Sequence, residues 1–391
     1  MKKNFLNVLI IAIFLVAGVV SCNKDNNNEV DDRALMVRMA DEGILISGTL
    51  TEKLELKSNI EYELTGSFVV GPKGELHIPA GTVIKANQGF SNYILVLQDG
   101  KIFANGTADK PIKMTSNSDS PQQGDWGGLI INGRAPLADP NEVGSTEISA
   151  KHKYGGNKVD DNSGVLTYLI LEYTGARSSA DVEHNGLTLN GVGNGTKIEN
   201  IFIPHGADDG IEFFGGSVNV KNLLVVNSDD DMFDFTQGYT GTLENCYGIW
   251  EPGFVSSESD PRGIEADGNL DGKNPNHPNQ SNFTVKNMTI DLRLAPSTDE
   301  GKYMHAAIKI RRGAKATVEN ALIKGQGQLR DLVDMTDKKG DGNSGSVINI
   351  TNKLSTPIFG KETKGTANIT IKDDGNTGCP TNIFGWTGYK F

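Results

Sequence analysis

The tripeptide Ile198-Glu199-Asn200 opens a series of five segments that each join an aliphatic residue, a charged residue and an asparagine. The other four are Val220-Lys221-Asn222, Leu243-Glu244-Asn245, Val285-Lys286-Asn287 and Val318-Glu319-Asn320. The first three lie 22 and 23 residues apart, and the later spacings widen where polar loops such as 267–281 are inserted. A short, fixed period with loop insertions is typical of a solenoid that winds one coil per repeat. The series therefore predicts a β-helix.

The rest of the chain supports an all-β fold. Glycine accounts for 47 of 391 residues and clusters, with Asn and Asp, between short apolar runs such as Phe68-Val69-Val70 and Ile94-Leu95-Val96-Leu97. This spacing leaves no room for crossover helices and indicates strands separated by turns. One short helix is expected, at Val30 to Ala40, where it would cover the open edge of the first coil. We therefore predict one single-stranded parallel β-helix domain over residues 34–391, with a short N-terminal cap.

The N-terminus has the pattern of an exported lipoprotein. Lys2 and Lys3 precede an apolar run over residues 8–20, which ends in Val19-Val20-Ser21-Cys22. The run is shorter than the ~20 residues that span a bilayer, so it predicts a signal peptide over residues 1–21. The cysteine resembles that of a bacterial lipobox, which implies lipidation of Cys22; a secreted protein with a chance cysteine is the alternative. Residues 22–33 then form the lipidated cysteine and a polar, flexible tether. Its acidic character resembles a surface-export signal and implies an outer-membrane lipoprotein exposed at the cell surface.

Charge and cysteine content limit the partners and the cross-links. The chain has 37 basic and 49 acidic residues, and removal of Lys2 and Lys3 makes its net charge of -12 more negative still. Its largest basic cluster is the short stretch 309–312, so nucleic acid is not an expected partner. Cys246 follows Asn245 in the repeat and should point inward as a small apolar side chain. No disulfide with the distant Cys379 is expected.

Four further motifs carry a family resemblance. They are His77-Ile78-Pro79-Ala80-Gly81-Thr82-Val83-Ile84-Lys85, Gly106-Thr107-Ala108-Asp109-Lys110-Pro111-Ile112, Gly124-Asp125-Trp126-Gly127-Gly128-Leu129-Ile130-Ile131-Asn132-Gly133 and Asp208-Asp209-Gly210-Ile211-Glu212-Phe213-Phe214-Gly215-Gly216. In this order they resemble a family of right-handed parallel β-helix lipoproteins from Bacteroidetes and related bacteria, over roughly residues 40–390. The resemblance implies a right-handed, pectate-lyase-like solenoid, and it implies no particular activity.

The repeat also predicts which side chains stack. Aligned on the asparagines, the next strands read Ile211-Glu212-Phe213, Phe233-Asp234-Phe235, Ile264-Glu265-Ala266 and Ile308-Lys309-Ile310. Alternation turns the middle residue of each strand outward, and coils stack at ~4.8 Å. This predicts one exposed column of Glu212, Asp234, Glu265 and Lys309. The asparagines should form an internal ladder with a structural role.

Two acidic turns precede these strands and predict a metal site. They are His205-Gly206-Ala207-Asp208-Asp209-Gly210 and Asn227-Ser228-Asp229-Asp230-Asp231-Met232. The register stacks Asp208 on Asp230, Asp209 on Asp231, and Glu212 on Asp234. Calcium takes six to eight oxygen ligands, so these six carboxylates predict a calcium site, and no organic cofactor is indicated. The alternative is a solvated acidic turn with Arg262 as counter-charge.

A second candidate calcium loop is Asp267-Gly268-Asn269-Leu270-Asp271-Gly272, which matches the first half of a calcium-binding loop. The position where such a loop needs a glutamate holds Pro278. A separate loop begins at Trp250 and Phe254, whose aromatic rings are candidates for stacking on a sugar. Packing of this loop against its own coil is the alternative.

Three functions are compatible with these features. The preferred hypothesis is a non-catalytic cell-surface lipoprotein that binds a glycan or another extracellular ligand, with no catalytic residue assigned. The second is a polysaccharide lyase or glycoside hydrolase, because such enzymes with β-helix folds use stacked carboxylates, calcium and a basic residue. In that case Asp208, Asp209, Asp230 and Asp234 would be the acids, and Arg262 or Lys309 the base. The third is a structural surface spacer. The fold alone does not establish an activity.

Overall fold

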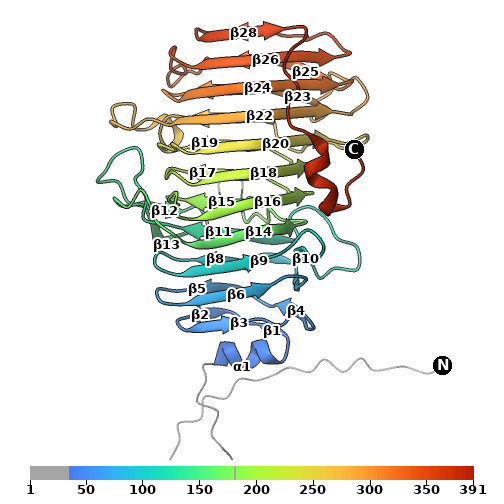
Figure 1. Ribbon diagram of the computed structural model, residues 1–391. Coiled ribbons are helices and arrows are strands. Elements are labelled where there is room, and N and C mark those ends of the chain that lie inside the picture. Colours follow the sequence, from blue (N-terminus) through green and yellow to red (C-terminus); the bar gives the residue numbers. More distant parts are fainter. Residues whose placement is uncertain (1–34, 180–181) are drawn as a thin grey trace, which may run out of the picture. The chain divides into compact units, whose positions relative to one another are not determined.

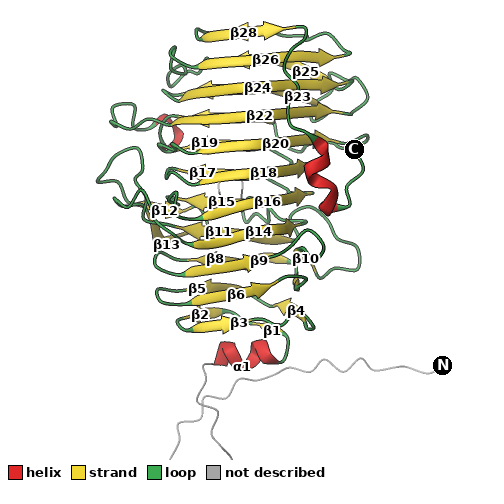
Figure 2. Ribbon diagram, viewed as in Figure 1, coloured by secondary structure: helices red, strands yellow, loops and turns green. Residues whose placement is uncertain are grey.

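The computed structural model describes residues 35–179 and 182–391 (Figure 1). Over these residues the chain winds into one right-handed parallel β-helix, as predicted. Most coils add one strand to each of two large sheets, whereas the first coils add two short strands to the first sheet. Neighbouring strands in space are therefore successive turns of the chain. All strand pairs within these two sheets are parallel (Figure 2). The expected signal peptide (1–21), Cys22 and the tether (22–33) lie outside the described residues.

The first sheet contains 15 strands. They are β1 (Ile44–Leu45), β3 (Lys53–Glu55), β4 (Glu61–Leu64), β6 (Glu75–Pro79), β7 (Val83–Ala86), β9 (Lys101–Asn105), β10 (Ile112–Ser116), β14 (Gly164–Leu171), β16 (Lys197–Pro204), β18 (Asn219–Val226), β20 (Thr242–Trp250), β22 (Asn282–Leu292), β24 (Lys315–Gly325), β26 (Val347–Leu354) and β28 (Asn368–Lys372).

The second sheet contains 11 strands. They are β2 (Gly48–Leu50), β5 (Ser67–Val70), β8 (Gly89–Val96), β11 (Trp126–Asn132), β15 (Leu187–Asn190), β17 (Ile211–Phe214), β19 (Phe233–Thr236), β21 (Arg262–Asp267), β23 (Tyr303–Arg311), β25 (Gln328–Asp334) and β27 (Thr363–Lys364). The strands β12 (Gly144–Thr146) and β13 (Ser149–Tyr154) form a separate antiparallel hairpin.

The repeated asparagines form the predicted ladder. The side-chain amide of Asn222 donates to the Oδ1 atom of Asn200 at 2.9 Å, and Asn245, Asn287 and Asn320 continue the series at 2.8–2.9 Å. All five have a left-handed backbone with φ between 52° and 59°, a conformation that asparagine tolerates better than most residues. The ladder is partly buried. It bends each strand from β16 to β24 and so fixes a corner of the helix.

The core follows the predicted alternation. Val220, Leu223 and Val225 on β18 are almost completely buried, whereas Lys221 between them is exposed. Cys246 pairs in register with Leu223 on one side and Met288 on the other, and it is buried as expected. Cys246 and Cys379 are both free thiols.

A short helix caps the N-terminal end of the β-helix. The helix α1 (Leu35–Asp41) buries Met36, Val37 and Ala40 against the first coil. The cap predicted over Val30 to Ala40 is confirmed from Leu35 onward, and residues 30–34 lie outside the described part. Among the described residues, no helix has the length and the apolar character needed to cross a membrane.

The C-terminal segment folds back along the outside of the first sheet. After β28 the chain reaches Cys379 and the 3-10 helix η2 (Thr381–Thr387), which lies beside β16, β18 and β20 (Figure 1). Phe384 packs there on an outward apolar stripe formed by Phe202, Leu224, Val226, Tyr247 and Ile249. This segment therefore removes from solvent a surface that the winding alone would leave exposed.

Candidate functional site

The acidic column forms in the predicted register on the outer face of the second sheet. Glu212 pairs with Asp234, Asp234 with Glu265, and Glu265 with Lys309. The expectation that this column is exposed is wrong, because Glu212 and Glu265 retain only 8% and 7% of their accessible surface. These carboxylates point outward from the sheet, as the repeat predicts, but they are largely buried.

An excursion from the helix covers this column. Residues 133–163 leave the repeat and carry the β12–β13 hairpin, which arches over β17, β19 and β21. Tyr154 of the hairpin packs near Phe214, and its hydroxyl donates to the Oε1 atom of Gln237 at 2.6 Å. Between hairpin and sheet remains a cavity of about 300 Å³. Its acidic lining comprises Glu147, Glu212, Asp234, Glu265, Asp267 and Asp271, together with the base Arg311.

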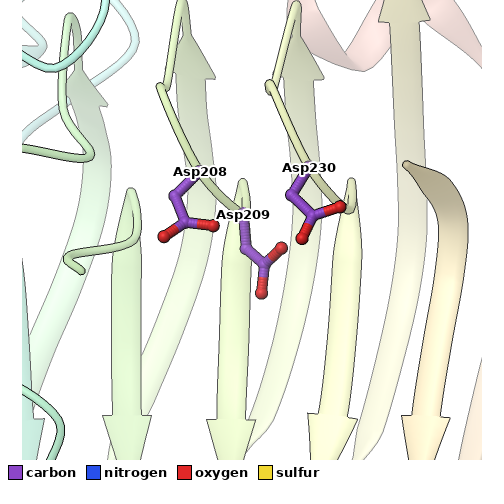
Figure 3. Close-up of side chains that lie close together, drawn as sticks. All are labelled: Asp208, Asp209 and Asp230. Carbon is purple, nitrogen blue, oxygen red and sulfur yellow. The ribbon is translucent and has the colours of Figure 1, made fainter. Parts of the chain in front are cut away.

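The two acidic turns, which precede β17 and β19, bring their carboxylates together between neighbouring coils. Asp208 and Asp209 come from one coil and Asp230 from the next, and Figure 3 shows the three side chains gathered between these coils. One oxygen of each lies within 4.8 Å of the others. Two further groups meet the same limit: Asp209, Glu212 and Asp234, and then Asp231, Asp234 and Glu265. The six residues predicted as metal ligands therefore form a continuous acidic cluster.

Protein hydrogen bonds satisfy only part of this cluster. Asp209 accepts the backbone N–H of Asp231 at 2.9 Å, and Glu212 accepts the side-chain amide of Asn185 at 2.6 Å. One buried oxygen remains without a hydrogen-bond partner on each of Asp230, Asp231 and Asp234. Asp231 is only 2% exposed. A buried carboxylate oxygen without a donor is costly, so these oxygens fit a bound cation.

Burial changes the protonation of the cluster. Desolvation, followed by repulsion from neighbouring carboxylates, raises the pKa of five acids well above their usual range: Asp208, Asp209, Glu212, Asp231 and Asp234. For Asp230, burial and then Glu265 raise the pKa to about 7. The solvated-turn alternative does not fit these buried positions. Both causes favour the protonated, neutral form of these carboxyl groups, and a bound cation would favour the ionised form.

Glu147 approaches the cluster from the hairpin. Its side chain keeps contact with solvent at the mouth of the cavity. Desolvation by the neighbouring protein groups, with repulsion from Glu183, raises its pKa. The carboxylate therefore extends the acidic lining to the side opposite the sheet.

The basic residues near the cluster are all engaged in ion pairs. Arg262 contacts Asp260 and Glu265 closely, and its Nη1 atom lies 3.7 Å from Asp231. Lys309 donates to Asp334 at 2.8 Å and to the carbonyl oxygen of Thr336 at 2.6 Å. Arg262 thus provides the predicted counter-charge to Asp231, but it is shared among three carboxylates and neutralises the cluster only in part.

The side chains of the second candidate calcium loop are bound by neighbouring protein groups. The two carboxylate oxygens of Asp267 accept from Arg311 at 2.6 Å and from Arg312 at 2.5 Å. Asn269 bonds to Gln280, and Asp271 forms an ion pair with Lys273 at 2.6 Å. The would-be ligands thus hold separate protein partners, and calcium binding by this loop stays a prediction.

The prediction for Trp250 is also corrected. Its indole is completely buried, donates to the carbonyl oxygen of Ser228 at 3.1 Å and packs against Phe254. A buried ring has no face free for a sugar. Phe254 is half-buried and lines an apolar surface cleft of about 350 Å³ with Val255 and Leu294. Ligand binding by Phe254 stays a prediction.

Some residues of the site lie outside the repeat and were not found by sequence reasoning. Glu147, Tyr154 and Asn185 come from excursions without the asparagine pattern. Arg177, from the same region as Asn185, forms ion pairs with Glu258 at 2.6 Å and Glu183 at 3.2 Å. Of the contacts in this site, only the stacking of the two acidic turns could be predicted from the sequence, because the repeat length fixes which residues of successive coils are neighbours.

Comparison with known proteins agrees with this architecture. Residues 48–387 match the family described as the pectate-lyase-like beta helix domain. Since the match spans most of the chain, the protein belongs to this family. Searches among curated proteins and among solved structures found no match.

Proposed function

We propose that this protein is a non-catalytic outer-membrane lipoprotein, anchored through Cys22 and exposed at the cell surface, that binds an extracellular glycan. The β-helix serves as a rigid scaffold for the site, and calcium bound between the coils helps to form it. The lipobox resemblance supports the anchor. The acidic cluster beside the hairpin cavity supports the binding site.

The observation that carries the binding proposal is the set of buried carboxylate oxygens without partners. Calcium would be held by Asp208, Asp209 and Asp230, and Glu212, Asp234 and Asp231 belong to the two adjoining groups of carboxylates. A cation at this position would keep the acids ionised and would offer its remaining coordination positions to hydroxyl or carboxylate oxygens of a sugar. The adjoining cavity, at about 300 Å³, is at the lower end of the range for small-ligand sites.

The state of the basic residues supports a non-catalytic role. A lyase mechanism requires a base that can take a proton from the substrate. Arg262 is only 9% exposed and forms ion pairs with three acids, and Lys309 is held by Asp334. Neither side chain lines the acidic cavity, and Lys309 borders a separate surface cleft with Thr336.

A glycan-binding screen with a parallel reducing-end assay tests this proposal. We expect calcium-dependent binding of at least one glycan without release of new reducing ends. Glu147→Arg should abolish that binding, because it reverses the charge at the cavity mouth. The matched variant Glu300→Arg changes an exposed loop residue that does not line the cavity, and it should bind normally. A glycan affinity that changes neither with chelator nor in Glu147→Arg would contradict the proposed site.

One observation favours a glycoside hydrolase as the second candidate. Glu147 and Glu212 line the same cavity from opposite sides, one from the hairpin and one from the sheet. Paired carboxyl groups of this kind serve as acid and base or nucleophile in glycosidases. Hydrolysis of a bound glycan that is lost in both Glu147→Gln and Glu212→Gln would establish this alternative over the non-catalytic role.

A further inference from the structure

The two ends of the β-helix differ in whether another element covers the terminal coil. At the N-terminal end, α1 covers the first coil and buries three of its own side chains there. At the other end, β28 is the last strand of the first sheet, and no described element lies beyond it (Figure 1). An uncovered edge strand offers unpaired backbone groups to another strand.

The open edge also exposes part of the core. Ile369 and Ile371 of β28 stack in register on Ile348 and Ile350 of β26, which are completely buried. Both isoleucines of the last strand remain partly exposed, as do Leu354, Ile358 and Ala367 around them. The apolar interior of the solenoid therefore ends at solvent, and burying it would be favourable.

The hydrogen-bonding pattern of β28 fixes which groups are available. The N–H of Asn368 donates to the carbonyl oxygen of Ser346 at 2.9 Å, toward β26. Alternate residues of a strand direct their backbone N–H and C=O groups to opposite sides. The backbone groups of Thr370 therefore also point to β26, while those of Ile369 and Ile371 point to the open edge. Two residues, one on each side of Thr370, thus present free N–H and C=O groups. The edge has neither a proline nor a bulge, two features that usually block such pairing.

We propose that this edge pairs with the same edge of a second copy of the chain, in an antiparallel arrangement centred on Thr370. The strand Asn368-Ile369-Thr370-Ile371-Lys372 is self-complementary in that register. Ile369 would lie opposite Ile371 of the second copy, Thr370 opposite Thr370, and Lys372 opposite Asn368. Apolar residues then meet apolar residues, and no like charges lie directly opposite each other.

The antiparallel register also matches the free backbone groups. In an antiparallel pair, residues that exchange both hydrogen bonds alternate with residues that exchange none. Ile369 and Ile371 would form the bonded pairs, and Thr370 would sit at the two-fold axis in a non-bonded pair. The two interiors would then join into one continuous core. Head-to-tail stacking is blocked because α1 occupies the first coil, so a closed, symmetric pair is the arrangement that fits.

Cysteine cross-linking of the full chain tests this arrangement. In Thr370→Cys the two thiols would face each other across a non-bonded pair, with Cβ atoms about 4.5–5.5 Å apart, and mild oxidation should give a covalent dimer. The control is Asn349→Cys, on the outward face one coil back, in register with Thr370. Its copies would be about 14 Å apart, beyond the reach of a disulfide. Wild type controls for the native cysteines.

Charge substitution provides a second, independent measurement. Thr370 is exposed in the single chain, so Thr370→Lys and Thr370→Asp should leave its far-UV circular dichroism spectrum unchanged. Each variant alone should weaken self-association at least tenfold in sedimentation equilibrium, and an equimolar mixture should restore a mixed dimer. A wild-type chain that sediments as a monomer overturns the proposal. Equal cross-linking of Thr370→Cys and Asn349→Cys, or unchanged association of the charged variants, overturns it as well.

Discussion

The response of stability to calcium and pH depends on the acidic cluster. In the cation-free protein, burial raises the pKa of Asp230 from 3.8 to about 7. A carboxyl whose folded pKa is raised contributes stability that is fully present below pH ~4 and is lost as pH rises through ~7. At about 1.4 kcal/mol per unit, Asp230 alone accounts for a loss on the order of 4 kcal/mol between these limits. Chelated protein should therefore unfold at a lower temperature at pH 7.5 than at pH 5.

Calcium should reverse this loss, because it replaces protons on the same oxygens. At a concentration of 100 Kd, a ligand that binds only the folded state adds about 2.7 kcal/mol. For a domain of roughly 350 residues this corresponds to about 3–4 °C in melting temperature. We expect the increase to be larger at pH 7.5 than at pH 5, where protons compete with the ion. Scanning calorimetry in calcium and in chelator at the two pH values measures it.

The double variant Asp208→Asn, Asp230→Asn separates the cation from simple repulsion. It should lose the calcium response and, in chelator, should melt no lower than wild type, because two buried acids become neutral amides. Asp374→Asn makes the same chemical change at a side chain that is 92% exposed and should behave as wild type. A calcium response that persists in the double variant, or one that is larger at pH 5, would refute the reasoning.

Three further predictions concern the anchor, the core and the corner of the helix. Cys22→Ala should move the protein from the membrane to the soluble fraction, and a variant that stays membrane-bound after detergent-free washing argues against lipidation. Leu223→Asp should cost at least about 4 kcal/mol in urea unfolding because it buries an unpaired charge, whereas the exposed Lys221→Asp should cost little; equal costs would contradict the register. Asn222→Ala should lower the free energy of unfolding by about 2–3 kcal/mol, because it loses the ladder hydrogen bonds and strains a left-handed backbone. Asn222→Gly should lower it by about 1 kcal/mol less, because glycine adopts that backbone freely. The reverse order would show that the ladder conformation is unimportant.

The sequence alone determined the winding of the chain and the stacking of its coils. The asparagine repeat placed Val220, Leu223 and Cys246 in the core, and it placed Glu212, Asp234 and Glu265 in one column. These relations follow from local rules, since the alternation of a strand and the repeat length together fix which residues of successive coils are neighbours. The pairing of Asp208 with Asp230 was predictable for the same reason.

Only the tertiary structure decided what covers that column and what surrounds it. The hairpin over Glu212 and the burial of Trp250 depend on how excursions of irregular length fold back on the helix, and no periodic signal specifies this. The same holds for the partners of Asp267, whose arginines come from the following coil. The sequence thus specified the positions of the acids, and the packing of non-repetitive loops against the coils determined their burial and hence their protonation.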